Sequence, residues 1–198
     1  MAQFTAGLID VFAENPFGGN PLAVVENADG LSDAQMRRIA GEFNQAETTF
    51  LLQSDRADRK LRSFTASGAE VFGAGHNALG AWLWMGEHGQ LGSLDTPTTF
   101  RQEIGDDVLP ITLVSTGGRI HGRMRQAALR LSAPLAATDA LAEALGLTPD
   151  DLAPFPAARA ADTGAAHLMV RLRDARAVDR AAPSAPALLA VLGSAGAE

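Results

Sequence analysis

Glu47 has the best placement for acid–base chemistry in this sequence. It follows a helix-like segment that ends near Asn44, and it begins an apolar run over residues 48–52. Burial at the start of such a strand penalises the charged carboxylate and raises its affinity for a proton. A carboxylate in that setting can act as a general base near neutral pH. The alternative interpretation is a solvated glutamate at a strand end, which is the commoner arrangement.

A glycine turn, Gly73-Ala74-Gly75, leads through His76 and Asn77 into an apolar segment. Glycines ahead of a helix expose backbone N–H groups, which can hold an anion such as a substrate carboxylate. The glycine spacing also matches the dinucleotide-binding fingerprint, but only residues 70–72 precede it as strand-like sequence. A nicotinamide dinucleotide site is therefore the weakest interpretation. The remaining alternative is that these glycines only form a tight turn and bind nothing.

His76 lies where this helix is expected to begin. A helix N-terminus disfavours the imidazolium ion, so a neutral His76 could orient a substrate or relay a proton. The alternative is a structural, hydrogen-bonded histidine. The other histidines, at positions 88, 121 and 167, show no metal-ligand spacing with it, and no HExxH, Walker A or GxSxG pattern occurs. We therefore expect neither a metal centre nor a serine hydrolase. Asn20, between Gly19 and Pro21, is a turn residue by default and a candidate pocket residue.

The composition limits the class of protein. The 198 residues carry a formal charge of −7, and 46% are hydrophobic and 20% charged. That balance is typical of a globular protein with one large domain or two small ones. An acidic chain without a basic patch is not expected to bind nucleic acid. No run reaches the roughly 18 apolar residues of a membrane span, so no membrane partner is expected.

Cysteine is absent from the sequence. Its absence excludes disulfides, thiolate nucleophiles and cysteine-ligated metal sites. Residues 1–5 show no basic region ahead of an apolar one, so we expect no secretory signal. Both observations favour a cytoplasmic protein.

The elements that must position these groups can be read from local patterns. Ser32 is the expected N-cap of a helix, with Gln35 as its capping-box partner and Asn44 as its end. Residues 78–85 are apolar on every side, which indicates a buried helix that protein must surround. Runs of β-branched and apolar residues predict strands at 7–12, 22–25, 47–52 and 61–65. The sequence therefore predicts an α+β fold in which a sheet wraps around a central helix.

A break is expected at Gly117-Gly118 and the arginine-rich residues that follow. It divides the chain into domains 1–118 and 119–198. In the second domain we expect a helix over 138–147 with Thr138 as N-cap, a strand over 167–172 and a short helix after Pro183. The order helix, loop, strand repeats that of residues 32–52, which is a weak internal repeat.

Taken together, these segments resemble the phenazine biosynthesis (PhzF-like) isomerase family, whose fold is shared with diaminopimelate epimerase. The resemblance runs from about residue 3 to about residue 175 and is strongest in the first ninety residues. It rests on these residues: Asp10-Val11-Phe12, Phe17-Gly18-Gly19-Asn20-Pro21-Leu22-Ala23-Val24-Val25, Leu31-Ser32, Met36, Ile39-Ala40, Phe43-Asn44, Glu47-Thr48-Thr49-Phe50, Phe64-Thr65, Glu70, Gly75-His76, Leu79-Gly80, Asp162-Thr163-Gly164 and His167-Leu168.

The resemblance implies two similar domains with the active site between them, and acid–base catalysis without a cofactor. The family's catalytic glutamate falls on Glu47, and its histidine and glycine at the central helix fall on His76 and Gly75. The phenazine enzyme moves a proton on a dihydro-hydroxyanthranilate, so the expected substrate is a small carboxylate-bearing metabolite. The epimerase relatives use two thiols, which this chain lacks. A carboxylate-based proton shuttle at Glu47 is the remaining option.

The sequence departs from the family in three places. The usual Gly-His-Pro-Thr reads Gly75-His76-Asn77-Ala78, which removes a hydroxyl that could contact substrate, and the usual proline after Phe64-Thr65 is Ala66. An Asp-Pro-x-Thr-Gly-Ser-like segment is not found, so the second domain is expected to be truncated. The alternative function is therefore an inactive relative that binds small molecules or partners. Bare sheet edges and apolar faces would then favour a homodimer, domain swapping or aggregation.

Overall fold

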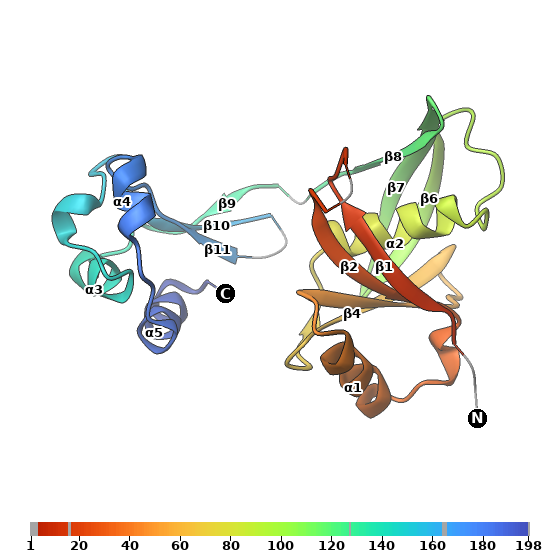
Figure 1. Cartoon of the computed structure of the whole chain (residues 1–198), viewed down its shortest axis with the longest axis horizontal. Coiled ribbons are helices and arrows are strands. Elements are labelled where there is room, and N and C mark those ends of the chain that lie inside the picture. Colours follow the sequence, from red (N-terminus) through yellow and green to blue (C-terminus); the bar gives the residue numbers. More distant parts are fainter. Residues whose placement is uncertain (1–3, 16, 127, 164–165, 198) are drawn as a thin grey trace. The chain divides into compact units, whose positions relative to one another are not determined.

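The structure is a computed structural model that describes residues 4–15, 17–126, 128–163 and 166–197. Residues 1–3 of the expected N-terminal segment and Gly164 of the expected Asp162-Thr163-Gly164 element lie outside these ranges. The chain forms two compact units, Met1–Arg125 and Gln126–Glu198. Both mix helices and strands, which confirms the α+β class (Figure 1).

A curved sheet forms the framework of the first unit. Its described strands follow the order β1-β2-β3-β4-β6-β7-β8, and β5 pairs with Ser63 and Phe64 of β4. Neighbours are antiparallel except for the parallel pairs β2–β3 and β4–β6. The bounds are β1 Ala6–Val11, β2 Asn20–Val25, β3 Glu47–Leu52, β4 Arg59–Thr65, β5 Glu70–Val71, β6 Thr98–Ile104, β7 Asp107–Thr116 and β8 Arg119–Met124.

The helix α2 (His76–Glu87) occupies the concave side of this sheet, as predicted (Figure 1). Eight of its residues are buried, and Trp82 is fully enclosed. Gly80 lets the helix approach β1 and β2 closely. A Cβ atom there would lie 2.6 Å from the side chains of Leu22 and Val11, well inside van der Waals contact. The apolar surface on every side of α2 is thus buried by the surrounding strands.

The helix α1 (Asp33–Phe43) covers the opposite face of the sheet. Its predicted capping box is confirmed, because Ser32 accepts from the Gln35 amide and the Gln35 side chain accepts from Ser32 N–H. Asn44 ends the helix with φ +50°. Successive side chains of β3 point to opposite faces of the sheet, so Phe50 packs against α1, whereas Leu51 packs against α2. A short 3₁₀ turn, η1 (Ala28–Gly30), precedes α1.

The expected break at Gly117-Gly118 is a hairpin turn. Both glycines have positive φ, +60° and +76°, and they connect β7 to β8. Tight hairpins need positive φ at their central residues, which glycine adopts without steric cost. Strand β8 therefore belongs to the first unit, and the boundary lies after Arg125 rather than after Gly118. Strands β6, β7 and β8 were not predicted from the sequence.

The second unit is built on a small antiparallel sheet. Its strands are β9 (Arg130–Leu131), β10 (Arg159–Asp162) and β11 (Ala166–Met169), in the order β11-β10-β9. The helices α3 (Thr138–Ala144), α4 (Ala175–Arg180) and α5 (Ala185–Ala195) and the 3₁₀ turn η2 (Pro149–Asp151) complete it. Its core contains Leu141, Ala144 and Val191.

Of three local predictions for this unit, one is confirmed and two are wrong. The helix after Pro183 is confirmed as α5. Thr138 is the first helical residue of α3 and the N-cap is Ala137, so the predicted N-cap is wrong by one residue. The strand expected to reach Leu172 ends at Met169, because the chain turns away there and Leu172 only bridges Leu152. None of the helices that the structure describes is long and apolar enough to cross a membrane.

Candidate active site

Glu47 and His76 come together at one edge of the sheet in the first unit. Glu47 is the first residue of β3 and His76 is the first residue of α2. The Oε2 atom of Glu47 lies 3.1 Å from the Nε2 atom of His76. Their side chains are only 20% and 12% exposed. The fold therefore places a carboxylate and an imidazole in direct contact where bulk water has limited access.

The two facing atoms have no other polar partner among the described residues. Oε2 of Glu47 and Nε2 of His76 are each buried as atoms and make no hydrogen bond of good geometry, even with each other. They are close enough to pair as ions but are not aligned for a hydrogen bond. Buried polar atoms are rarely left without a partner in folded proteins. Such unpartnered atoms occur at catalytic sites and where a ligand, an ion or a water supplies the missing partner.

The glycine turn before His76 is held by Asn77. The Nδ2 atom of Asn77 donates to the Gly73 carbonyl at 2.9 Å and to Oγ of Ser63 at 3.1 Å, and its Oδ1 atom accepts from the Gly75 N–H at 2.8 Å. Both amide hydrogens of Asn77 and the Gly75 N–H are thus used inside the protein. The predicted carboxylate cradle at Gly73–Gly75 therefore cannot use the Gly75 N–H. The predicted substrate-binding side chain of Asn77 has no free donor.

Asn20 is a strand residue rather than the turn residue that we expected. It begins β2 and pairs with Val11 of β1. Its neighbour Pro21 does not break the strand: it is the second strand residue and pairs with Asp10, and the pairing of β2 with β3 begins only at Ala23. The parallel register of Ala23 with Thr48 puts the starts of β2 and β3 at the same edge. Asn20 is exposed at that edge and shares it with Glu47, although no contact joins the two.

Two exposed aromatic residues next to this edge were not singled out from the sequence as site residues. Phe12 follows the end of β1 and is 72% exposed, and Phe17 precedes β2 and is 99% exposed. Both have positive φ, +62° and +64°, which is rare for bulky residues. The Phe17 N–H donates to Oδ2 of Asp10 at 2.7 Å, which fixes this loop. Sequence patterns give no signal for positive φ at phenylalanine.

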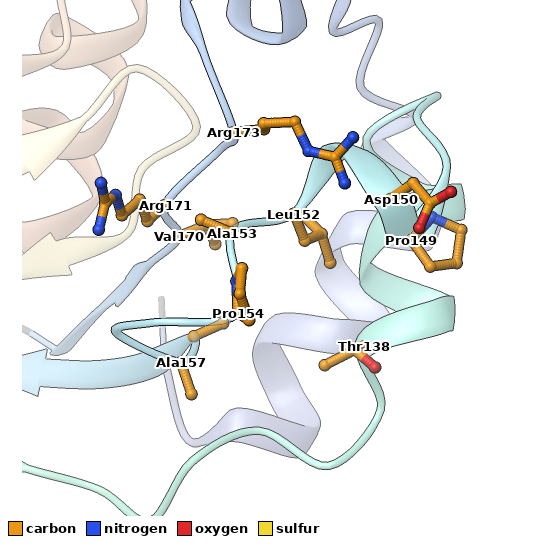
Figure 2. A pocket seen from close by; sticks show the side chains of 11 residues that line it. Thr138, Pro149, Asp150, Leu152, Ala153, Pro154, Ala157, Val170, Arg171 and Arg173 are labelled. Carbon is orange, nitrogen blue, oxygen red and sulfur yellow. The ribbon is translucent and has the colours of Figure 1, made fainter.

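A pocket of about 360 Å³ lies in the second unit and was not predicted (Figure 2). Leu152, Val170 and several alanine and proline residues line it, with Asp150 and Arg173 among its charged residues. Arg171, also in the lining, donates to the Phe155 carbonyl at 2.6 Å. All three charged residues are exposed. Among the described residues, this pocket therefore offers no buried acid–base pair comparable to Glu47 and His76.

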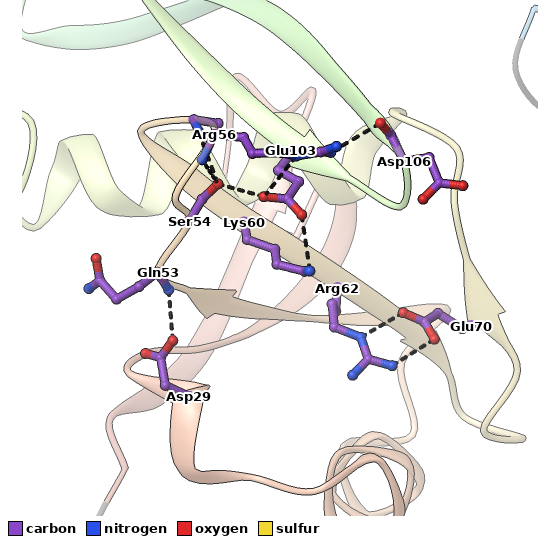
Figure 3. Close-up of polar contacts among 10 residues, drawn as sticks. Asp29, Gln53, Ser54, Arg56, Lys60, Arg62, Glu70, Glu103 and Asp106 are labelled. Carbon is purple, nitrogen blue, oxygen red and sulfur yellow. Dashed lines mark hydrogen bonds and ion pairs between the residues drawn. The ribbon is translucent and has the colours of Figure 1, made fainter.

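Two clusters of ion pairs in the first unit link elements of its framework (Figure 3). Glu103 on β6 contacts Lys60 on β4 at 3.0 Å and accepts from the Ser54 hydroxyl. The Ser54 hydrogen bond, followed by Lys60, lowers the pKa of Glu103 below its usual range. Glu103 and Lys60 are partners in the two-residue parallel register that joins β4 to β6.

A second ion cluster joins α1 to the sheet. Arg62 on β4 donates to both carboxylate oxygens of Glu70 on β5 and to Oδ1 of Asp33 on α1 (the Glu70 pair is drawn in Figure 3). These bonds raise the pKa of Arg62, and the Arg62 hydrogen bond lowers the pKa of Asp33. Both clusters consist of satisfied pairs, unlike Glu47 and His76. In the described part of the chain, no group of three or more His, Cys, Asp or Glu is arranged to hold a metal ion.

Comparison with known proteins identifies the family. Residues 9–197 match the family described as phenazine biosynthesis-like protein, PhzC-PhzF. The chain belongs to this family. The family resemblance inferred from the sequence motifs is therefore confirmed. The match extends over both units.

Relatives of this PhzF-family chain carry isomerase or epimerase names. The uncharacterized isomerase YddE of Salmonella typhimurium is 34% identical over 185 residues, which is 92% of this chain and 61% of YddE. The trans-2,3-dihydro-3-hydroxyanthranilate isomerase of Pseudomonas chlororaphis is 45% identical over 82 residues, 41% of this chain and 29% of that enzyme. A solved "Predicted Epimerase" of Pseudomonas aeruginosa superposes with a TM-score of 0.87 at 30% identity, covering 99% of this chain and 68% of that one.

The chain and YddE also differ in length. The chain spans 61% of the length of YddE. The family and the fold are therefore shared, whereas activity and substrate are matters for proposal.

Proposed function

We propose that this protein is an isomerase or epimerase that moves a proton on a small carboxylate-bearing metabolite by general acid–base catalysis. The single observation that carries the proposal is the contact between Oε2 of Glu47 and Nε2 of His76 at 3.1 Å. Both atoms are buried and have no hydrogen bond to any described residue, so the pair keeps hydrogen-bonding capacity that the framework does not use. The isomerase names of the relatives support the same reaction class.

In the proposed reaction, Glu47 accepts a proton from a carbon of the substrate next to an electron-withdrawing group. The C–H bond breaks, and its electron pair moves into that group as an enolate-like anion. The proton on the Glu47 carboxyl group exchanges with solvent, and Glu47 then delivers a proton to another carbon, which completes an isomerisation without a net change of protons. General acid–base catalysis of this kind contributes about 10²- to 10⁴-fold. Because no cysteine is present, a thiol pair cannot supply these steps.

His76 has the supporting role in this proposal. Its imidazole touches one oxygen of Glu47 and leaves the other carboxylate oxygen for the substrate. The first turn of α2 also presents N–H groups that have no acceptor within the helix, and a helix N-terminus stabilises negative charge. We propose that these amides, rather than the occupied Gly75 N–H, face the developing anion. Glu47 and His76 are in direct contact and so form a single proton-transferring group, which favours a proton shift over inversion at one carbon.

The test is the uptake of solvent deuterium by trans-2,3-dihydro-3-hydroxyanthranilate, the compound named for one relative. The wild-type protein in D₂O should introduce deuterium into the carbon framework, detected by NMR or mass spectrometry. Glu47→Gln should lower the rate by about 10²- to 10⁴-fold, because an amide cannot accept the proton. Glu42→Gln, the same change at an exposed position of α1, is the matched control and should retain the rate. Full exchange by a folded Glu47→Gln variant would remove Glu47 from the mechanism.

A second candidate function is binding without catalysis. It is favoured by the exposed apolar residues Leu131 and Met169 on the sheet of the second unit. Bare apolar surface of this kind favours association with a partner or a second copy. Light scattering together with the exchange assay separates the two candidates. Association without any exchange supports the binding function, whereas exchange that depends on Glu47 supports the isomerase.

A further inference from the structure

We propose that Asn77 is a positioning residue that sets the contact between His76 and Glu47. This inference rests on the proposed function of that pair. Asn77 is the second residue of α2 and is 3% exposed. Both of its amide hydrogens are donated within the protein, so it acts on the reaction through the placement of its neighbour His76.

The side chain of Asn77 ties the turn before His76 to the sheet. One amide hydrogen goes to the Gly73 carbonyl and the other to Ser63 on β4, while the amide oxygen holds the Gly75 N–H. The backbone on both sides of Ala74 is therefore held by one side chain. His76 follows this turn directly. The turn therefore fixes the position of the His76 Cα atom independently of any contact that its side chain makes.

The same network reaches the strand that carries Glu47. Oγ of Ser63 and Oγ1 of Thr49 are 2.8 Å apart, and Thr49 donates to the backbone carbonyl of Asn77 at 3.4 Å. Thr49 lies two residues after Glu47 on β3 and therefore on the same face of the strand. Thr49 and Ser63 are 0% and 3% exposed. The network thus links the backbone of both members of the pair.

One assignment of the hydrogens satisfies every contact in this network. In it, Thr49 gives its hydroxyl hydrogen to the Asn77 carbonyl, and Ser63 supplies the hydrogen between the two hydroxyls. Ser63 in turn accepts from the Asn77 amide. The bonds therefore run in one closed cycle from the Asn77 side chain through Ser63 and Thr49 back to the Asn77 backbone. Each hydroxyl donates once and accepts once, and such connected networks hold groups rigidly in one arrangement.

The side chain of His76 lacks comparable support of its own. Its Nε2 atom has no hydrogen bond, and Glu47 is its only ion-pair partner among the described residues. The position of the imidazole therefore depends on where the backbone starts the helix. A small shift of that start changes the 3.1 Å contact, and a displacement of about 1 Å can cost about 100-fold in rate.

Two variants of Asn77 separate positioning from stability. Asn77→Ala removes all three bonds. Asn77→Asp keeps the volume and suits the first turn of a helix, but its second oxygen would face the Gly73 carbonyl with no hydrogen to donate. Gln102→Ala is the matched control, because Gln102 is a fully buried amide that accepts from Trp82 farther along the same helix. All three lose a buried amide contact, but only the first two change the turn before His76.

The first readout needs no substrate. The imidazole ¹⁵N signals of His76 report its tautomer and its hydrogen-bonding partner. They can be assigned by comparison with His76→Gln, since the chain has four histidines. We expect Asn77→Ala and Asn77→Asp to shift these signals in the manner of Glu47→Gln, and Gln102→Ala to leave them as in the wild type. Unchanged His76 signals in folded Asn77→Asp would overturn the inference.

The second readout is deuterium exchange into trans-2,3-dihydro-3-hydroxyanthranilate. We expect kcat to fall by about 100-fold in both Asn77 variants with KM little changed. Gln102→Ala should keep the wild-type kcat at temperatures below its own melting temperature. Equal losses in Gln102→Ala and Asn77→Asp would show a merely structural role and overturn the inference. Absence of exchange in the wild type would overturn the proposed function alone, because the ¹⁵N signals still decide whether Asn77 positions His76.

Discussion

Glu47 begins β3 and His76 begins α2, and their side chains meet at 3.1 Å although β4 and β5 lie between them in the chain. The contact depends on two features of the fold. Strand β3 presents Glu47 on the same face as Leu51, which packs against α2. The glycine turn before α2 then lets the helix begin directly above the start of that strand. The pair is thus a product of the framework and not of a sequence motif.

The hydroxyl network under the pair predicts opposite effects at two adjacent threonines. Thr49 bonds Ser63 and the Asn77 carbonyl, so Thr49→Val should lower the free energy of unfolding by about 1–3 kcal/mol. The Thr48 hydroxyl is buried and has no hydrogen bond to any described residue, so Thr48→Val should be neutral or stabilising. Urea denaturation followed by tryptophan fluorescence measures both, since the two tryptophans lie in α2 of the first unit. Equal losses in the two variants would contradict the network.

The close approach of α2 to β1 and β2 predicts that Gly80 cannot accept a methyl group. A Cβ there would lie 2.6 Å from Leu22 and Val11, so Gly80→Ala should cost about 1–3 kcal/mol through overpacking. Gly41→Ala is the matched control in α1, where the nearest atom is 3.4 Å away. It should stabilise by about 0.5–1 kcal/mol, because alanine is the better helix former. Chemical denaturation of both variants checks the pair, and a stabilised Gly80→Ala would refute the packing.

The capping box of α1 predicts a graded response at Ser32. Its hydroxyl accepts from the Gln35 N–H, so Ser32→Ala should cost about 1 kcal/mol. Ser32→Gly should cost only a few tenths of a kcal/mol, because glycine is also favoured at N-caps. The melting temperature of the first unit, read from tryptophan fluorescence, distinguishes the two. If alanine and glycine were tolerated equally, the cap would not contribute as described.

The lowered pKa of Glu103 predicts how stability depends on pH. The Ser54 hydroxyl and then Lys60 stabilise the charged form, so the folded state holds this carboxylate ionised to a lower pH than the unfolded state does. The resulting stability is present at neutral pH and is lost as pH falls through the lowered pKa. Glu103→Gln should therefore melt below the wild type at pH 7, and the difference should shrink at pH 3. A difference that stays constant over this range would argue against the ion pair.

Local chemistry could be predicted from the sequence where a few adjacent residues decide the outcome. The capping box at Ser32 and Gln35 and the end at Asn44 follow from side-chain preferences within one helix. The buried helix at α2 follows from apolar residues on all sides, which must be covered whatever the fold. For the same reason the candidate pair could be named from Glu47 before an apolar strand and His76 at a helix start.

Features that depend on pairing between distant segments could not be predicted. Strands β6–β8 carry polar residues on their exposed positions and were missed, and their hairpin at Gly117-Gly118 was mistaken for a domain boundary. Asn20 is a strand residue because β1 pairs with it, which its neighbours Gly19 and Pro21 do not reveal. The role of Asn77 depends on Ser63, a residue of β4 that only the folded sheet brings within 3.1 Å.

A double-mutant cycle of solvent-deuterium exchange tests the central claim most directly. Exchange into trans-2,3-dihydro-3-hydroxyanthranilate is measured for the wild type, Glu47→Gln, His76→Gln and the double variant under identical conditions. If the two residues act as one acid–base unit, the double variant should be no slower than Glu47→Gln within a few-fold. Losses that multiply, or a wild-type rate in either single variant, would contradict the claim that Glu47 transfers the proton with His76 as its supporting partner.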